Sequence, residues 1–239
     1  MKKIALVLLM VLSVSSQKEI QVIFNSENTK LVRFELDLIK DLIDEYGKMK
    51  NTNFKIKYKG VKTFKSGFTM LLDSDKDATL VINGISITDE RLKTYDFSEP
   101  YMINKYSLMS RKDFDFKNDG KTMKVAYQAG SIYEGMMNKI KQIFPCKGVA
   151  LANTSECVEK LQDRKVDMIF GDFVDSWIFG INVVQHVDES KIDRYGIMYK
   201  KGSTLKQDLD KVFDQYKTSA KYKTLLKKHF GSYQKQFFN

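Results

Sequence analysis

One arginine, Arg91, lies in a short polar segment whose residue types suit carboxylate binding. The segment begins at Asn83, directly after an apolar run that predicts a buried strand, and continues through Gly84 and Ser86. Glycine lets a bound group come close to the backbone, and Thr88 is placed to cap a short helix that carries Arg91. A guanidinium is a planar fork that matches two carboxylate oxygens. The pattern therefore predicts a carboxylate clamp, with a surface arginine in a loop as the alternative.

A second region of the chain offers an anion-binding turn and a carboxylate. Gly130 and Ser131 follow another predicted strand, and Ser131 has Glu134 three residues later, which is the spacing of a capping box. A helix N-terminus presents free N–H groups to anions. Farther along, the apolar run 166–170 predicts a buried strand with Asp172 just past its end. An arginine from one region and a carboxylate from the other suit a zwitterion.

Residues for nucleophilic or metal-dependent catalysis are scarce. There are two histidines, of which His186 lies among valines and His229 in a predicted C-terminal helix, so packing or surface roles are favoured for both. The patterns GxSxG, HExxH, CxxC and the P-loop do not occur. Asp172 and Asp175 form an acid pair, but such spacing arises by chance in a chain with 30 acidic residues. These observations favour binding over catalysis and predict no cofactor and no metal.

The N-terminus has the pattern of a secretory signal peptide. Two lysines follow the initiating methionine, residues 4–12 are apolar, and a cluster of serines comes next. The apolar run is far shorter than the roughly 20 residues that a membrane-spanning helix needs. We therefore expect residues 1–16 to be a cleaved signal peptide, the mature chain to begin near Ser16 or Gln17, and the protein to reach the periplasm without a lipid anchor.

The basic charge of the chain does not indicate a nucleic-acid partner. The 239 residues include 40 Lys+Arg and 30 Asp+Glu, for a formal net charge of +10. Export removes the chain from nucleic acids, and the basic residues are scattered among acidic ones without a long block. A solvated basic surface is the preferred interpretation, and the length suits two lobes of similar size.

Hydrophobic periodicity predicts an α/β fold in which one pattern occurs twice. The elements predicted for the first set are strand 20–24, helix 34–46, strand 54–58, helix 65–72 and strand 78–82. Those predicted for the second set are strand 124–128, helix 131–143, strand 149–152, helix 155–162 and strand 166–170. A last strand within 195–200 precedes helices 205–216 and 221–229. The two sets, separated by the polar stretch 113–121, predict two lobes.

The two cysteines, Cys146 and Cys157, fall on different predicted elements. Cys146 lies near the start of a strand and Cys157 in the first turn of the following helix. This placement puts their Cα atoms more than about 7 Å apart, which disfavours a disulfide bond, although export would permit one.

The motif GISITDERLKTYDFSEPYM resembles the signature of the family-3 bacterial extracellular solute-binding proteins, the polar amino-acid receptors of ABC transporters. The order of FELDLIKDLI, VAYQAGSIYE, KVDMIFGD, YGIMYKKGS and KYKTLLKKHFG agrees, so the resemblance covers the mature chain. It implies the type II periplasmic binding protein fold, with a mixed sheet flanked by helices in each lobe. Residues 17–109 plus 199–239 would form lobe 1 and residues 110–198 lobe 2, joined by hinge strands near 107–112 and 197–200.

The resemblance also implies a ligand-binding set and a partner. Arg91 would bind the α-carboxylate of an amino acid, and Asp172 would hold its ammonium group. The residues expected to help at the carboxylate end are Asn83, Gly84, Ser86, Gly130 and Ser131. The protein would act as a monomer, closing around an amino acid or related carboxylate and delivering it to an inner-membrane ABC permease.

Two departures from the family pattern concern the side-chain pocket. The loop 24–30 is short and has no aromatic residue beyond Phe24, and Ile132 stands where a hydroxyl residue is common. Two alternatives stay open. One is a periplasmic enzyme of the cyclohexadienyl dehydratase type on the same fold, with Glu27 or Asp172 as its acid. The other is a sensory or interaction protein that has lost uptake.

Overall fold

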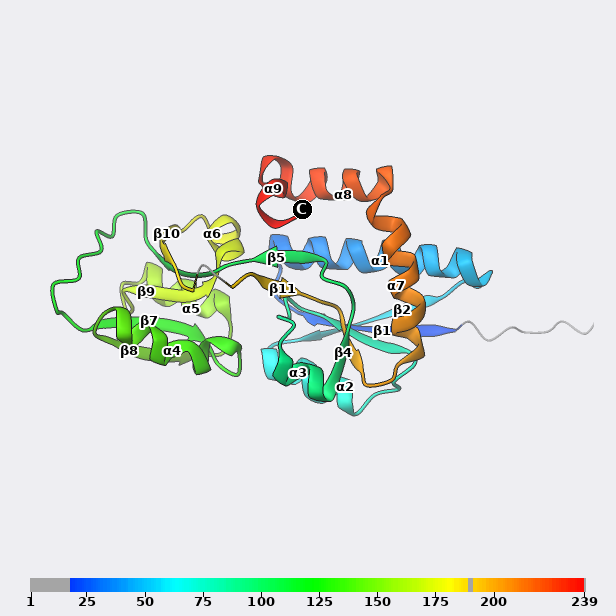
Figure 1. The fold of residues 1–239 in the computed structure, drawn as a ribbon, viewed down its shortest axis with the longest axis horizontal. Helices are drawn as coiled ribbons and strands as arrows, with labels where there is room; N and C mark the ends of the chain where they lie inside the picture. Colours follow the sequence, from blue (N-terminus) through cyan, green and yellow to red (C-terminus); the bar gives the residue numbers. More distant parts are fainter. Residues whose placement is uncertain (1–17, 189–190, 239) are drawn as a thin grey trace, which may run out of the picture.

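The computed structural model describes residues 18–188 and 191–238, so the predicted signal peptide lies outside the described residues. The chain forms two α/β lobes, each built on one five-stranded sheet, with a two-stranded ladder between them (Figure 1). Among the described helices, none combines the length and apolar character required to cross a bilayer. The α/β class and the mixed sheets predicted from the sequence are confirmed.

Lobe 1 contains the sheet with strand order β2-β1-β3-β12-β4, in which β1, β2 and β3 are parallel and β12 is antiparallel to its neighbours. Its strands are β1 (Glu19–Asn25), β2 (Lys55–Val61), β3 (Thr79–Ile82), β4 (Tyr95–Phe97) and β12 (Met198–Lys200). Its helices are α1 (Lys30–Lys50), α2 (Phe64–Leu72), α3 (Asp89–Thr94), α7 (Thr204–Lys217) and α8 (Ala220–Phe230).

Successive side chains along the central strands of lobe 1 point to opposite faces of the sheet, and each face is covered by its own helices. Val22 and Leu80 point into a core shared with α1, α7 and α8. Ile23 and Val81, one residue further along, point into a separate core with α2. This period of two is what a sheet buried on both faces requires, and it explains the nearly continuous apolar runs in the sequence.

Lobe 2 has the order β10-β6-β9-β7-β8, with α4 on one face and α5 on the other. Its strands are β6 (Tyr106–Ser110), β7 (Met123–Gln128), β8 (Cys146–Leu151), β9 (Met168–Asp172) and β10 (Asn182–His186). Its helices are α4 (Ile132–Ile143), α5 (Thr154–Gln162) and α6 (Phe173–Phe179). Cys146 and Cys157 are free thiols on β8 and α5, the two elements on which the sequence placed them.

The lobes are joined by β5 (Met102–Asn104) and β11 (Asp193–Tyr195), which pair antiparallel. The hinge strands predicted near 107–112 and 197–200 differ from this arrangement. β6 pairs with β9 and β10 inside lobe 2, and β12 pairs with β3 and β4 inside lobe 1. The predicted boundaries at 109/110 and 198/199 therefore fall within strands that belong to a single sheet, and the crossing lies a few residues earlier on both chain segments.

The C-terminal region packs beside the hinge. The 3₁₀ helix η1 (Gly231–Tyr233) and α9 (Gln234–Phe237) follow α8, and α9 contacts β5. The fully buried Phe237 belongs to the same core as Val174 of α6, so lobe 1 and lobe 2 share apolar packing at this point.

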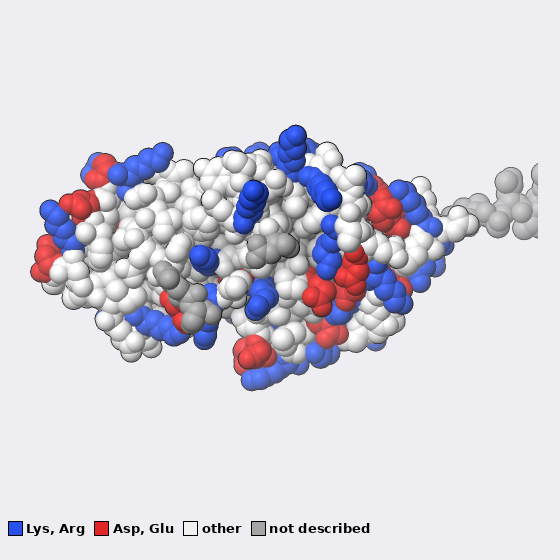
Figure 2. Space-filling model, turned by 45° about the horizontal axis from the view of Figure 1, so that its top comes forward, with Lys and Arg blue, Asp and Glu red and all other residues white. Residues whose placement is uncertain are grey.

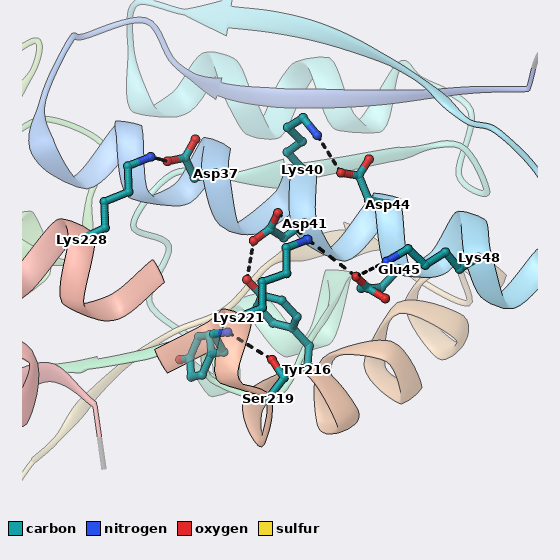
Figure 3. A network of polar contacts seen from close by, with 11 residues as sticks. Asp37, Lys40, Asp41, Asp44, Glu45, Lys48, Tyr216, Ser219, Lys221 and Lys228 are labelled. Atoms are coloured by element: carbon teal, nitrogen blue, oxygen red, sulfur yellow. Dashed lines mark hydrogen bonds and ion pairs between the residues drawn. The ribbon is translucent and has the colours of Figure 1, made fainter. Parts of the chain in front are cut away.

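Charged side chains of both signs are interspersed over the face drawn in Figure 2. Figure 3 shows how the outer side of α1 is paired with α7 and α8. Lys221 contacts Asp41 at 2.8 Å and Glu45 at 3.6 Å, and the Tyr216 hydroxyl donates to Asp41. Such pairing agrees with the solvated basic surface expected from the sequence.

Candidate functional site

A cavity of about 70 Å³ lies between the lobes, at the carboxyl ends of strands from both sheets. Asn25 and Asn83 line it from the ends of β1 and β3, and Gln128 and Asp172 line it from the ends of β7 and β9. Ligands of open α/β sheets bind at this edge. A Cβ atom on Gly130 of lobe 2 would lie 3.8 Å from Cβ of Lys65 in lobe 1, so the lobes approach closely beside the cavity.

Larger cavities lie elsewhere on the surface, and the residues that line them differ from those of the cavity between the lobes. One of about 470 Å³ is formed over α1 and α7 and is lined by Glu45, Lys48 and Lys221. These side chains are ion-paired with one another. The smaller cavity between the lobes is therefore the candidate site, because both sheets contribute polar residues to it.

Asn83 and Gly84, which the sequence predicted to bind a ligand, both line the cavity. Gly84 has φ +56°, a conformation that glycine adopts without strain. Its N–H donates to Oε1 of Glu35 at 2.7 Å. The Gly84 N–H, which the sequence predicted to be free for a ligand, is therefore bonded to the buried side chain of Glu35 in α1.

Arg91 lies on α3 as expected, with Thr88 as the N-cap that accepts from the Arg91 N–H at 3.2 Å. Its guanidinium donates through Nη1 to the carbonyl oxygen of Ser86 at 2.8 Å. The same group lies 5.2 Å from the ring centroids of both Phe64 and Phe68. Arg91 is not among the residues that line the cavity, because the backbone of Ser86 and the ring of Phe64 hold its guanidinium.

Ser86 is buried and its hydroxyl is bonded to a carboxylate of this chain. It donates to Oδ2 of Asp193 at 3.1 Å, and the Tyr106 hydroxyl donates to Oδ1 of the same residue at 3.2 Å. Asp193 lies on the hinge strand β11 and is 2% exposed. Burial lowers the pKa of Arg91, and the negative charge of Asp193 is the strongest influence in the opposite direction. An internal carboxylate therefore faces the predicted clamp.

Asp172 lines the cavity at the end of β9, as predicted. Burial raises its pKa well above the usual range, the negative charges of Asp193 and Asp175 add to this, and the hydroxyls of Tyr133 and Tyr195 oppose it. Its Oδ1 is buried and has no hydrogen-bond partner within the described part of the chain. Asp172 thus keeps one buried oxygen without a donor, while the hydroxyls of Tyr133 and Tyr195 interact with its carboxyl group.

Gly130 and Ser131 form the predicted turn, but their polar groups are bonded within it. The Ser131 hydroxyl donates to the Gln128 carbonyl at 2.6 Å and accepts from the Tyr133 N–H at 3.2 Å. The Gly130 N–H donates to Glu134 at 3.3 Å, so Glu134 reaches the residue before the N-cap. Neither residue lines the cavity; the turn instead directs Tyr133 into it.

Several lining residues were not identified as ligand-binding from the sequence. The acidic ones are Glu27, Glu35 and Asp175, and the aromatic ones are Phe64, Tyr133, Phe179 and Tyr195. Glu35 had a signal, because it stands at helical spacing from Leu38, Ile39 and Leu42 and so on the apolar face of α1. Asp175 accepts from the Asp172 N–H at 3.2 Å, and burial raises its pKa to about 7.

The two-lobed architecture with a cavity at the strand ends is that of the type II periplasmic binding proteins. The chain belongs to the bacterial extracellular solute-binding proteins, family 3, whose model matches residues 14–232. A protein of Campylobacter jejuni described as a probable histidine-binding protein is 27% identical over 214 residues, covering 85% of this chain and 78% of that protein.

Two solved structures show the same architecture. An ancestral arginine-binding protein bound to arginine is 26% identical and has a TM-score of 0.73, covering 90% of this chain and 99% of that one. The ancestral amino-acid-binding protein AncCDT-1, a precursor of cyclohexadienyl dehydratase, is 22% identical with a TM-score of 0.73, covering 89% and 95%. The family and the fold predicted from the sequence are confirmed.

Proposed function

We propose that the protein is exported, captures an amino acid or a similar small zwitterion between its lobes, and delivers it to an inner-membrane ABC permease. The observation that carries this proposal is the cavity to which Asn83 of lobe 1 and Asp172 of lobe 2 both contribute. Groups on two bodies joined by a narrow hinge can grip one ligand when the lobes close and release it when they open. The family and its amino-acid-binding members support the same role.

Asp172 is the proposed partner of the ligand ammonium group, because its buried Oδ1 lacks a donor. Asn83 and Gly84 would lie against the ligand from lobe 1. Arg91 and Ser86 would attract a ligand carboxylate, which must compete with Asp193 for them. Gly130 and Ser131 would act indirectly by positioning Tyr133.

A thermal melting panel tests this function. A ligand at about 100 times its Kd stabilises a fold by roughly 2.7 kcal/mol, which is a readily measured shift in Tm. We expect at least one of the common amino acids to raise the Tm in a saturable way. A flat response to the whole panel, repeated by calorimetric titration, would contradict the proposal.

Export is part of the same proposal and is tested separately. We expect the intact mass of protein recovered from the periplasm to correspond to a chain that begins near Ser16 or Gln17. A periplasmic form that retains residues 1–12 would contradict the cleavage.

A second candidate is a dehydratase of the cyclohexadienyl type, and one observation favours it. Asp175 has a pKa raised to about 7 by burial and lines a cavity, which is what a general acid at neutral pH requires. Incubation with prephenate or arogenate would yield aromatic products if this candidate is right. Binding of an amino acid without such turnover supports the transport role.

A further inference from the structure

The cavity between the lobes is lined by carboxylates from both sides. Glu27 and Glu35 come from lobe 1, and Asp172 and Asp175 come from lobe 2. The other lining residues carry no charge, and they include Phe64, Asn83, Tyr133 and Tyr195. In a chain with a formal charge of +10, four carboxyl groups at one cavity are a specific property of the site, and burial raises the pKa of Glu35, Asp172 and Asp175.

Two of these carboxylates have an oxygen that no group of the described chain satisfies. They are Oδ1 of Asp172 and Oε1 of Glu27, both fully shielded from solvent. A buried acceptor without a donor is costly, so a ligand that brings N–H groups is favoured at this place. Aromatic residues, namely Phe64, Tyr133 and Tyr195, line the same cavity.

A carboxylate of the chain already lies next to Asp172, close enough to share a hydrogen bond with it. Asp193 accepts from the Ser86 hydroxyl at 3.1 Å and from the Tyr106 hydroxyl at 3.2 Å. Its negative charge also raises the pKa of Arg91 against the effect of burial. Asp193 thereby makes the interactions that the sequence assigned to the carboxylate of a ligand.

We infer that the cavity selects ligands with net positive charge, whose amine or guanidine group lies against Glu27, Asp172 and Asp175, and that Asp193, beside Asp172, takes the place of a ligand carboxylate at Ser86 and Arg91. This inference rests on the proposed function, because it names the ligand class of the same site. Asp193 is then a specificity-determining residue. Each additional negative charge on a ligand is repelled by Asp193, whereas each positive charge is attracted by the lining.

The protonation of Asp172 also favours a ligand with positive charge. Burial and the neighbouring charges of Asp193 and Asp175 raise the pKa of Asp172, which means that the ligand-free site holds a proton there more tightly than an exposed aspartate does. A ligand cation can neutralise these carboxylates in place of protons.

Matched ligand pairs on the unaltered protein test the inference by calorimetric titration. Lysine is compared with 1,5-diaminopentane and arginine with agmatine, since the members of each pair differ by the carboxylate. We expect each amine to bind within about threefold of its amino acid, and glutamate to bind at least about 100-fold more weakly than either. Glutamine, which is neutral, is expected between them.

The Asp193→Asn variant provides a second test, in which the affinities for the same ligands are measured again. Asp214→Asn, on the exposed face of α7, removes the same charge away from the site and is the control. The neutral amide no longer repels a carboxylate or holds the Ser86 hydroxyl as strongly. We expect the affinity for lysine and arginine to rise by at least about tenfold, the affinity for the two amines to change by less than about threefold, and the control to behave as the parent.

Different results of these titrations would contradict the inference and the proposed function. Amino acids that bind more than about 30-fold tighter than their decarboxylated amines would overturn the role of Asp193 and leave amino-acid binding intact. Neutral or acidic amino acids that bind tighter than basic ones would overturn the charge selectivity. The absence of binding for every ligand would overturn the proposed function and the inference together. The ligand pairs decide the question even if Asp193→Asn does not fold.

Discussion

The indole ring of Trp177 in α6 stacks on the ring of Phe230 in α8, with the ring centroids 4.9 Å apart and the ring planes 20° from parallel. The contact joins lobe 2 to lobe 1 beside the hinge, and Phe173 of α6 packs on Phe237 of α9 next to it, at 5.5 Å. Aromatic contacts of this kind contribute free energy beyond the area they bury. They couple the two lobes independently of any ligand.

We therefore expect Trp177→Ala to lower the free energy of unfolding by about 2 to 3 kcal/mol, since a half-buried ring is removed from a shared core. In scanning calorimetry we expect the parent to unfold in one transition, and the transition of the variant to broaden or divide into two as the lobes lose their coupling. Trp177→Phe keeps a ring at this position and is the control. An unchanged, single transition in Trp177→Ala would contradict a coupling role for this contact.

The lobes could be predicted from the sequence because each central strand and each covering helix has its own hydrophobic period. Val22, Ile23 and Leu80 lie in continuous apolar runs that a sheet covered on both faces requires. The hinge could not be placed in this way. β5 and β11 contain three residues each, which is too short for a period to emerge, and their pairing depends on residues 89 positions apart, such as Asn104 and Asp193.

The site was predicted in part for the same physical reason. Asn83 and Asp172 follow strands, and the ends of parallel strands meet at one edge of a sheet, so their places could be inferred. Asp193 gave no signal, because its role comes from Ser86 and Tyr106, which lie far away in sequence. Arg91 was placed on the right element, but its orientation depends on the rings of Phe64 and Phe68.

Glu35 makes the stability of the protein depend on pH. It is 1% exposed, it accepts from the Gly84 N–H and the Tyr101 hydroxyl, and burial raises its pKa from 4.5 to about 7. In the native state it therefore retains a proton that the unfolded chain has released between these two pH values. Its contribution to the free energy of unfolding falls as pH rises through this window.

Glu35→Gln removes the charge and keeps the acceptor oxygen. We expect the variant to match the parent at pH 4.5 and to exceed it by about 1 to 3 kcal/mol at pH 8, measured by denaturant unfolding. Glu45→Gln, at an ion-paired position on the outer side of the same helix, is the control and should show no such pH-dependent gain. A Glu35→Gln variant less stable than the parent at pH 8 would show that the ionised carboxylate is favoured in the fold.

The two thiols are expected to differ in reactivity. Cys157 is 1% exposed, and burial raises its pKa to about 12, whereas Cys146 on β8 is half-buried. Alkylation requires the thiolate and access to solvent. Native protein treated with iodoacetamide at pH 8 should gain one adduct, located at Cys146 by peptide mapping, and unfolded protein should gain two. Equal labelling of both cysteines in the native state would contradict the buried position of Cys157.

The last prediction is an asymmetry between Asp172 and Arg91, the two residues that the sequence placed at opposite ends of one zwitterion. Asp172 has a buried oxygen without a donor, so a ligand ammonium group gains a partner there. Arg91 donates to the Ser86 carbonyl, lies against two aromatic rings and faces Asp193. Its charge is already partly balanced within the chain.

We expect Asp172→Asn to weaken arginine binding by about 2 to 4 kcal/mol, because a buried cation loses its charged partner. Arg91→Ala should weaken it by less than about 1 kcal/mol and should instead reduce the free energy of unfolding by a similar amount, since the contacts with Phe64 and Phe68 are lost. Titration calorimetry and thermal melting of both variants measure the two effects. Equal losses of affinity would mean that a ligand carboxylate displaces Asp193 and is held by Arg91, as the sequence alone suggested.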